Sequence, residues 1–482
     1  MMQDLNREFL LNSRSLPIKV VQFGEGNFLR AFVDYAFKIL NDEVGYNAGV
    51  AVVQPIESGM VSLLNEQEGL YTLFTKGVVK GEEIQENILI DTIVKGVNPY
   101  ANFEQFLELA REKDLEFVIS NTTEAGINYD GNDLFEMTPP NSFPAKLTRF
   151  LYERFQYFHG STDVGLTIIP CELINYNADT LKAIILKYIT LWKLSEEFKN
   201  WVLDACSFHN TLVDRIVPGY PKDDIEAYNR QLEYHDRLIV TAETFFLWVI
   251  EGDDSLRNRL PFHRTSLDVH IVKNMQPYRT RKVRILNGAH TAMVPFALLY
   301  GKETVKETVN DTFTGTFIRS LIFEEVVPTL NMEKEELESF AKDVFDRFRN
   351  PHIKHQLSSI ALNSISKFKV RVLPSLLEYV EITGKLPLRT VFAFACLIRF
   401  YKGQWQGKEL PVNDDVDIIN NFKNLWQQPL TVMVRHVLGT PSYWDIDLNQ
   451  INGLQQAIEN ALGFIETKGV KAGYEKFENS YN

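Results

Sequence analysis

One short stretch limits the possible fold more than any other. Ile18 to Phe23 (IKVVQF) is apolar and rich in β-branched residues, which favours a strand. Gly24-Glu-Gly26-Asn-Phe-Leu-Arg30 follows at once, and in residues 31–40 (AFVDYAFKIL) apolar side chains return at helical spacing. A strand, a glycine turn and a helix in this order predict the first unit of a Rossmann-type dinucleotide-binding domain.

The turn carries only part of the dinucleotide fingerprint, because Leu29 stands at the third glycine position of GxGxxG. Backbone N–H groups at the start of a helix still favour an anion. We therefore expect the cofactor pyrophosphate beside four residues of the turn, Gly24, Gly26, Asn27 and Phe28. Arg30 is a candidate for a direct phosphate ligand; the alternative is a plain tight turn with a surface ion pair.

A second strand-like run, residues 49–54 (GVAVVQ), bears on the choice between NAD and NADP. It ends where such domains usually place an acid on the adenosine ribose 2′-OH. The residue there is Gln54, so the nearest acid is Glu57 in the following loop. Glu57 favours NAD, although an exposed loop carboxylate without a ligand is the alternative.

Polar side chains follow two later strand-like runs. Residues 115–120 (LEFVIS) lead into Thr122, Thr123 and Glu124, and residues 164–170 (VGLTIIP) lead into Glu172 and Asn177. Ligands bind beyond the carboxyl ends of parallel strands, so we expect the first three to border the nicotinamide. Glu172 and Asn177 are candidate substrate contacts, with turn formation and capping of the next helix as the alternative.

From about residue 276 the pattern changes to long helical periods, such as residues 334–348 (KEELESFAKDVFDRF) and 390–401 (TVFAFACLIRFY). We therefore predict an α/β protein. A Rossmann-type NAD-binding domain would cover residues 1–275, and an α-helical substrate and catalytic domain would cover residues 276–482. Ligand clefts are common at such a junction.

At this junction, residues 278–291 (YRTRKVRILNGAHT) combine a lysine, an amide and an imidazole, Lys282, Asn287 and His290. On a regular α-helix the three share one side, although a rise of about 12 Å separates the first from the last. Oxidation of a secondary alcohol requires a base for its proton and donors for its oxygen, and these residue types supply both. The alternative is an amphipathic helix that begins with solvated cations.

Charge and cysteine content exclude several classes of protein. A net charge of −13 argues against nucleic acid or an anionic membrane as partner. Three distant cysteines without CxxC spacing indicate neither a disulfide framework nor a zinc site, and we expect no metal. The first residues lack a signal-peptide pattern, and no apolar run is long enough to span a bilayer. We expect a cytoplasmic protein.

Seven motifs, in order, make the chain similar to the mannitol dehydrogenase family of long-chain polyol and hexuronate dehydrogenases, which work without metal. They are GxGNFxRAF (Gly24 to Phe32), TTEAG (Thr122 to Gly126), VDRI (with Asp214), WVIE (Trp248 to Glu251), KxxxxNGxH (Lys282 to His290), RFRNP (Arg347 to Pro351) and SKxxxRxLP (Ser366 to Pro374). They extend over most of the chain, which is far more specific than any one motif.

The resemblance implies roles for individual residues. Lys282 would be the general acid and base, Asn287 an oxyanion donor, and His290 a contact to a substrate hydroxyl. Asp214 and Lys367 would lie around the sugar chain. An NAD-dependent oxidoreductase with a small sugar-derived substrate is therefore expected.

One departure from the family pattern narrows the substrate. Polyol-specific members have an amide where this chain has Leu173, so either Asn177 or another group replaces that oxyanion donor, or the oxyanion hole has one donor fewer. The variant CELI is similar to the branch that reduces a keto-hexuronate, and Arg284 is our candidate for the substrate carboxylate. The alternatives are a dehydrogenase for another hexuronate or for an uncharged polyol, a nucleotide-binding regulatory protein without turnover, and a metal-dependent sugar-acid isomerase.

Overall fold

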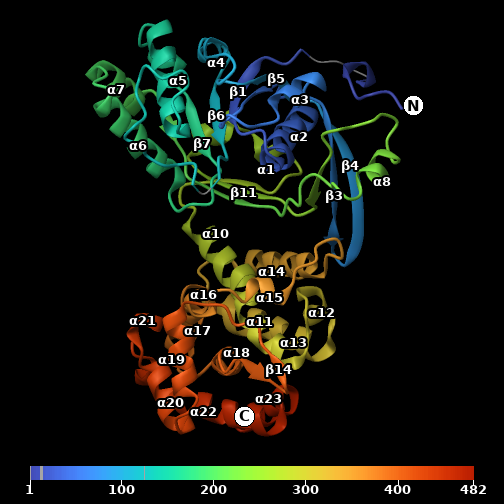
Figure 1. Ribbon diagram of the computed structural model, residues 1–482, viewed down its shortest axis with the longest axis vertical. Coiled ribbons are helices and arrows are strands. Elements are labelled where there is room, and N and C mark those ends of the chain that lie inside the picture. The colour runs from blue at the N-terminus through green and yellow to red at the C-terminus, as the bar shows by residue number, and fades with distance from the viewer. Residues whose placement is uncertain (1, 11–14, 124, 482) are drawn as a thin grey trace. The chain divides into compact units, whose positions relative to one another are not determined.

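The computed structural model describes residues 2–10, 15–123 and 125–481. The chain forms two compact units (Figure 1). The first contains Met1–Lys76 and Ile84–Met275, and the second contains Gly77–Glu83 and Gln276–Asn482. The division after Met275 falls where the helical periodicity of the sequence begins.

A six-stranded parallel sheet is the centre of the first unit, and its strand order is β5-β2-β1-β6-β7-β8. The strands are β1 Ile18–Phe23, β2 Gly49–Val53, β5 Ile93–Val97, β6 Phe117–Ser120, β7 Thr167–Pro170 and β8 Ser207–Phe208. The order reverses between β1 and β6, and this switch point is where such sheets bind ligands. The predicted Rossmann-type sheet is confirmed.

Helices cover both faces of this sheet. Neighbouring residues of a strand point to opposite faces, so each buried strand contributes apolar side chains to two cores. Val20 and Val52 belong to one apolar core together with α2 (Tyr35–Val44). Val21 and Val53 belong to a second core, which packs against helices on the other face: α4 Phe103–Ala110, α5 Phe143–Tyr157, α6 Asn177–Leu191 and α7 Glu196–Asp204. Burial on both sides explains why these strands read as continuous apolar runs.

Two smaller sheets complete the strands of the first unit. One has the order β10-β3-β4, formed by Val240–Glu243, Tyr71–Val79 and Glu82–Ile90. The other has the order β12-β11-β9, formed by Val269–Val272, Leu247–Glu251 and Thr211–Asp214. β3 and β11 follow the apolar runs of the sequence, whereas β4 (EEIQENILI) is largely exposed and gives no such signal. Short helices α3 Val61–Glu66, α8 Ile225–Asn229 and α9 Asp254–Arg259 lie between strands.

The second unit is helical, as predicted. Its helices are α10 Gln276–Arg281, α11 Gly288–Tyr300, α12 Val305–Asn310, α13 Thr312–Ser320, α14 Lys334–Arg349, α15 Leu357–Ile360, α16 Ser364–Arg371, α17 Leu373–Thr383, α18 Leu388–Phe400, α19 Val416–Leu425, α20 Leu430–Leu438, α21 Pro441–Trp444, α22 Leu454–Lys468 and α23 Val470–Asn479. The apolar helix α18 is buried along most of its length and packs against α11 and α22. Apart from residues 77–83, which contain the end of β3 and the start of β4, the strands in the described part of this unit are the two-residue pair β13 Gln404–Trp405 and β14 Lys408–Glu409.

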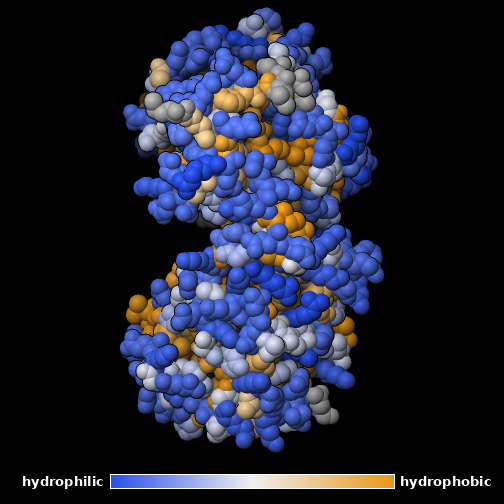
Figure 2. All heavy atoms as spheres, turned by 90° about the vertical axis from the view of Figure 1, so that its right-hand side faces the viewer, coloured by the Kyte–Doolittle hydropathy of each residue, from blue (hydrophilic) through white to orange (hydrophobic). Residues whose placement is uncertain are grey.

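The side chains are distributed as expected for cores covered by polar residues. The face shown in the space-filling view is mostly hydrophilic, with apolar atoms in separate patches (Figure 2). Along the described ranges, no helix combines the length and the apolar character that crossing a membrane requires.

Candidate cofactor site and catalytic helix

The glycine turn after β1 can accept an anion. Gly24 has φ +123°, and a Cβ there would lie 2.8 Å from Leu29 Cδ1 and 3.1 Å from the Asn121 carbonyl oxygen. Another residue would therefore be strained at this position. Gly26 differs, because it has φ −67° and no atom lies within 4 Å of a Cβ built on it. The open space at Gly26 stands at the start of the helical stretch from Asn27, which fits a phosphate.

Arg30 supports this turn from inside the protein. Its side chain is fully buried, and its Nε donates to the Glu25 carbonyl oxygen at 3.1 Å. Nη2 donates to Asn27 Oδ1 at 2.8 Å, and Nη1 donates to the Leu238 carbonyl oxygen at 2.7 Å. The prediction of Arg30 as a direct phosphate ligand is therefore corrected: the three bonds and the burial make it a brace of the turn.

The loop after β2 presents Glu57, as predicted, at the carboxyl end of that strand. Glu57 is exposed, and the buried amide of Gln54 shapes its loop by donating to the carbonyl oxygens of Ile56 and Glu57, each at 2.9 Å. Glu25 also reaches this loop, although no sequence pattern singled it out. This carboxylate accepts from Met60 N at 3.4 Å, and burial raises its pKa. Its position between the two glycines of the turn is the signal that could have identified it.

The polar residues that end β6 and β7 bind one another. Thr122 donates to Glu172 Oε1 from both its backbone N and its Oγ1, each at 3.0 Å, and Ser120 Oγ donates to Oε2 at 3.1 Å. Glu172 is 2% exposed, and burial raises its pKa. Glu172 therefore holds the loop that carries Thr122, so its prediction as a substrate contact is corrected. Thr123 has a positive φ of 76°, and Glu124 lies outside the described residues.

Asn177 does not replace the missing oxyanion donor. Its side chain is fully buried, and its Nδ2 donates to the carbonyl oxygens of Pro170 (2.9 Å) and Glu172 (3.1 Å) and to Thr211 Oγ1 (3.1 Å). The prediction that Asn177 contacts the substrate is therefore corrected: its side chain links β7 to β9. Leu173, at the position of the absent amide, is 61% exposed.

Asp214, another predicted substrate contact, ends β9 and lies opposite Leu247 of β11 in register. The Asp214 side chain is buried with 7% exposure. Its role toward a sugar remains a prediction.

In the second unit, Lys282–Asn287 forms a π-helical turn between α10 and α11. Hydrogen bonds from i to i+5 place residues five apart about one turn from each other, and such turns are frequent at functional sites. Lys282 and Asn287 are therefore closer in direction than the α-helical spacing of the sequence analysis implied. Both are partly buried. His290 follows three residues after Asn287. Its ring packs against Phe348 (4.5 Å between centroids) and His355 (4.7 Å).

The neighbouring arginines are neutralised within the unit. Arg284 donates to Glu378 through both terminal nitrogens, at 3.3 Å and 2.8 Å, and to Ser375 Oγ at 2.8 Å. Arg281 donates to Glu336 Oε1 at 2.8 Å, and both arginines are buried. The pairing with Glu378 speaks against Arg284 as the ligand of the substrate carboxylate, and that role stays a prediction.

Helix α16 brings Lys367 to the neighbourhood of the helical stretch that carries Lys282, Asn287 and His290, since α16 packs against both the π-helical turn and α11. Lys367 Nζ donates to the Ile360 carbonyl oxygen at 2.9 Å, and burial together with Arg371 lowers its pKa. A Cβ at Gly288 would lie 3.0 Å from the Arg371 carbonyl oxygen, so this glycine permits the close approach of α16. Lys367 stays a predicted substrate contact. Arg371 was missed, although it is part of the SKxxxRxLP motif.

Over the described ranges, no three His, Cys, Asp or Glu side chains gather in a way that could hold a metal ion.

The sheet order, the glycine turn at the switch point and the helix with its lysine, amide and imidazole define an oxidoreductase that uses a nicotinamide cofactor. The chain belongs to the mannitol dehydrogenase family. Residues 18–264 match the mannitol dehydrogenase Rossmann domain, and residues 274–466 match the mannitol dehydrogenase C-terminal domain. The family predicted from the motifs is confirmed.

Similar proteins include an altronate oxidoreductase of Bacillus subtilis (strain 168), which is 47% identical over 99% of this chain and 98% of that protein. An altronate oxidoreductase of Enterobacter sp. (strain 638) is 45% identical over 95% of this chain and 96% of that protein. Among solved structures, a D-sorbitol dehydrogenase in substrate-free form is 21% identical with a TM-score of 0.80, covering 95% of each chain. The Pseudomonas fluorescens mannitol 2-dehydrogenase, in a complex with NAD and D-mannitol, is 19% identical with a TM-score of 0.65, covering 99% of this chain and 100% of that chain. Both share the fold.

Proposed function

We propose that this protein interconverts D-tagaturonate and D-altronate with NAD as its cofactor. The observation that carries the proposal is the identity of 45% to 47% with two altronate oxidoreductases over nearly the full length of each chain. The sorbitol dehydrogenase, at 21% identity over 95% of each chain, supports the fold alone. The predicted keto-hexuronate branch agrees with this assignment.

The preference for NAD over NADP is supported by the charges around the loop after β2. Residues 54–60 (QPIESGM) contain no lysine or arginine, and Glu57 is exposed there. Glu25 reaches the same loop through Met60 N at 3.4 Å. On this loop a 2′-phosphate would face the Glu57 carboxylate and no lysine or arginine of residues 54–60, which disfavours its binding. Glu57→Gln and Glu25→Gln should each raise the NADPH to NADH ratio of kcat/KM, and an unchanged ratio in the double variant would contradict this assignment.

In the proposed mechanism Lys282 and Asn287 act on the oxygen of the substrate carbonyl, by proton transfer and by hydrogen bonding. The bound cofactor supplies the hydride for the carbonyl carbon. Lys282, as an ammonium, gives a proton to the oxygen, and Asn287 donates a hydrogen bond to it while negative charge develops. In the reverse direction neutral Lys282 takes the alcohol proton. His290, whose ring packs against Phe348 and His355, would contact a neighbouring hydroxyl of the sugar chain.

The test compares tagaturonate, fructuronate and fructose as substrates for NADH oxidation, each repeated with NADPH. Fast turnover of tagaturonate with NADH alone is expected. Preference for fructuronate or fructose would refute the substrate assignment, and NADH binding without any turnover would support a regulatory protein instead. The metal-dependent isomerase is tested by chelation, which should leave the rate unchanged.

Lys282→Ala tests the role of the lysine. Loss of the acid should lower kcat by about 10²- to 10⁴-fold while the Kd for NADH stays near its original value. Lys302→Ala is the matched control, because Lys302 lies in the same unit and pairs with Asp311 at 2.7 Å. Equal rates in the two variants would exclude Lys282 as the proton donor.

We also propose a cytoplasmic location. The three cysteines, Cys171, Cys206 and Cys396, are free and buried, which supports a reducing compartment. The proposed partner is the small sugar acid.

A further inference from the structure

Asp236 is a buried carboxylate far along the chain from the glycine turn. It binds the backbone N–H of Leu238, and the carbonyl oxygen of Leu238 accepts a hydrogen bond from Arg30, the residue that supports the turn. We propose that Asp236 is a positioning residue for cofactor binding, acting through the Leu238 carbonyl and Arg30 on the turn from Glu25 to Asn27. The inference rests on the proposed use of a dinucleotide, and it adds a residue to which neither the sequence motifs nor the family resemblance gave a role.

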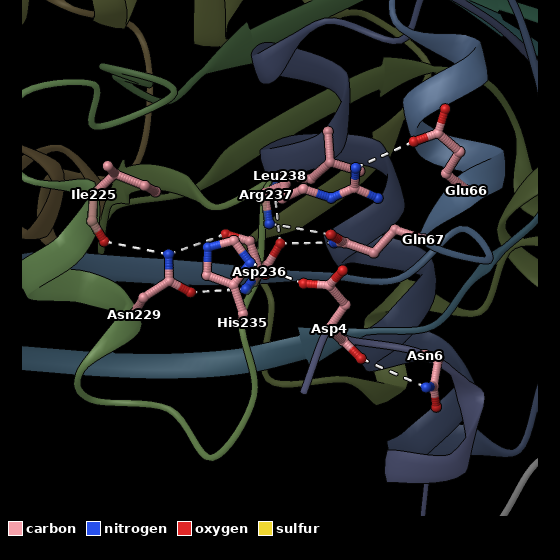
Figure 3. A network of polar contacts seen from close by, with 10 residues as sticks. All are labelled: Asp4, Asn6, Glu66, Gln67, Ile225, Asn229, His235, Asp236, Arg237 and Leu238. Carbon is pink, nitrogen blue, oxygen red and sulfur yellow. Dashed lines mark hydrogen bonds and ion pairs between the residues drawn. The ribbon is translucent and has the colours of Figure 1, made fainter. Parts of the chain in front are cut away.

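Asp236 fixes its own segment with an unusual number of bonds (Figure 3). Its Oδ1 accepts from Gln67 Nε2 and from Leu238 N, each at 2.7 Å, and its Oδ2 accepts from Thr72 N at 2.6 Å. Asn229 binds both backbone groups of the same residue, at 2.7 Å to N and 3.2 Å to O. Asp236 is fully buried, so water does not compete for these bonds. Together they fix the backbone that leads to Leu238.

The Leu238 carbonyl oxygen then accepts from Arg30 Nη1 at 2.7 Å. The same guanidinium binds the Glu25 carbonyl oxygen through Nε and Asn27 Oδ1 through Nη2. The planar guanidinium of Arg30 therefore connects Leu238, which lies outside the central sheet, to Glu25 and Asn27 of the turn. Burial of the Arg30 guanidinium is costly, and the negative charge of Asp236 is one of those that oppose the resulting fall in its pKa.

Removal of the Asp236 charge should act on cofactor binding more than on chemistry. In Asp236→Asn an NH2 group takes the place of one carboxylate oxygen, so either Thr72 N or Leu238 N loses its acceptor and faces a donor, and the Leu238 carbonyl is held less firmly. Arg30 then holds the turn less firmly, and the backbone N–H groups that receive the pyrophosphate are less ordered before binding. The catalytic lysine lies in the other unit, so kcat at saturating cofactor should change little.

The experiment uses the full chain with Asp236→Asn and measures the Kd for NADH by fluorescence titration, together with kcat and KM. We expect the Kd and the KM for NADH to rise about tenfold and kcat to stay within about twofold, in line with couplings between residues of one network. Asp133→Asn is the matched control. Asp133 is also a fully buried carboxylate of the first unit and accepts from Asn141 N, Ser142 N and Tyr188 Oη, none of which belongs to the turn.

A double-variant comparison separates positioning from a general loss of structure. If Asp236 acts through Arg30, then Asp236→Asn added to Arg30→Met should raise the Kd no further than Arg30→Met alone. Multiplied effects, or a Kd shift for Asp133→Asn as large as for Asp236→Asn, would overturn the proposal. If the unaltered protein bound no NADH, the proposed function would fail instead. If Asp236→Asn did not fold, Asn229→Ala, which loosens the same backbone, would replace it, and an unchanged Kd would then overturn the proposal.

Discussion

Asp34 gives a quantitative test of the chemistry beneath the glycine turn. It is fully buried, and desolvation raises its pKa to about 7, against the hydrogen bonds from Gln22 and Tyr71 and the nearby Arg30. Gln22 Nε2 lies 3.3 Å from Asp34 Oδ2 and donates to the Gly24 carbonyl oxygen at 3.0 Å. The other oxygen of each side chain, Asp34 Oδ1 and Gln22 Oε1, has no hydrogen-bond partner among the described residues.

The sign of the effect on stability follows from proton binding. The ordinary pKa of an aspartate is 3.8, so between about pH 4 and pH 7 the folded protein holds a proton on Asp34 that the unfolded chain has lost. The free energy of unfolding contributed by this group is therefore greatest at low pH and falls as pH rises toward 7. A difference of roughly 3 pKa units corresponds to about 4 kcal/mol. Asp34→Asn cannot ionise and should not show this loss.

Urea unfolding of both proteins at pH 5 and pH 8 measures the difference. Asp34→Asn should gain about 3 kcal/mol relative to the original protein between the two pH values, since about two pKa units of the shift lie above pH 5. The amide introduced by Asp34→Asn can also donate a hydrogen bond where the carboxylate offers only acceptors. The comparison at pH 5 reports the cost of the substitution itself. A difference between the two proteins that is the same at both pH values would refute the reasoning.

Two further predictions concern the cofactor turn and the cationic helix. Gly24→Ala should lower the free energy of unfolding by about 1–3 kcal/mol, because its Cβ would lie 2.8 Å from Leu29 Cδ1 at a positive φ; Gly26→Ala should leave stability within about 0.5 kcal/mol and raise the Kd for NADH. Unchanged NADH binding in Gly26→Ala would exclude a phosphate at that position. Arg284→Met should cost about 1 kcal/mol of stability by leaving the partly exposed Glu378 unpaired, and should not raise the KM for the sugar acid more than the KM for an uncharged polyol. A selective rise for the sugar acid would restore Arg284 as its ligand.

Local patterns in the sequence determined the fold class. The β-branched run of β1, the glycine turn and the later apolar runs are each encoded within a few neighbouring residues, and so is the helical period after residue 276. The family motifs singled out Lys282, Asn287 and His290 as the residues proposed for catalysis. These features are set by alternation, helical spacing and backbone freedom, which short stretches reveal without tertiary contacts.

Only the tertiary structure decided which groups the polar side chains bind. Arg30 binds a carbonyl 208 residues away, and Arg284 binds a carboxylate 94 residues away, so neither pairing leaves a local signal. The same holds for Asn177, whose partner Thr211 is 34 residues distant. From the sequence alone, a charged or amide side chain is equally able to bind a ligand or another part of the protein. Burial of such a side chain costs free energy unless each of its polar atoms has a hydrogen-bond partner. The fold therefore assigned these groups to support the site, because the partners that satisfy them come together only in three dimensions.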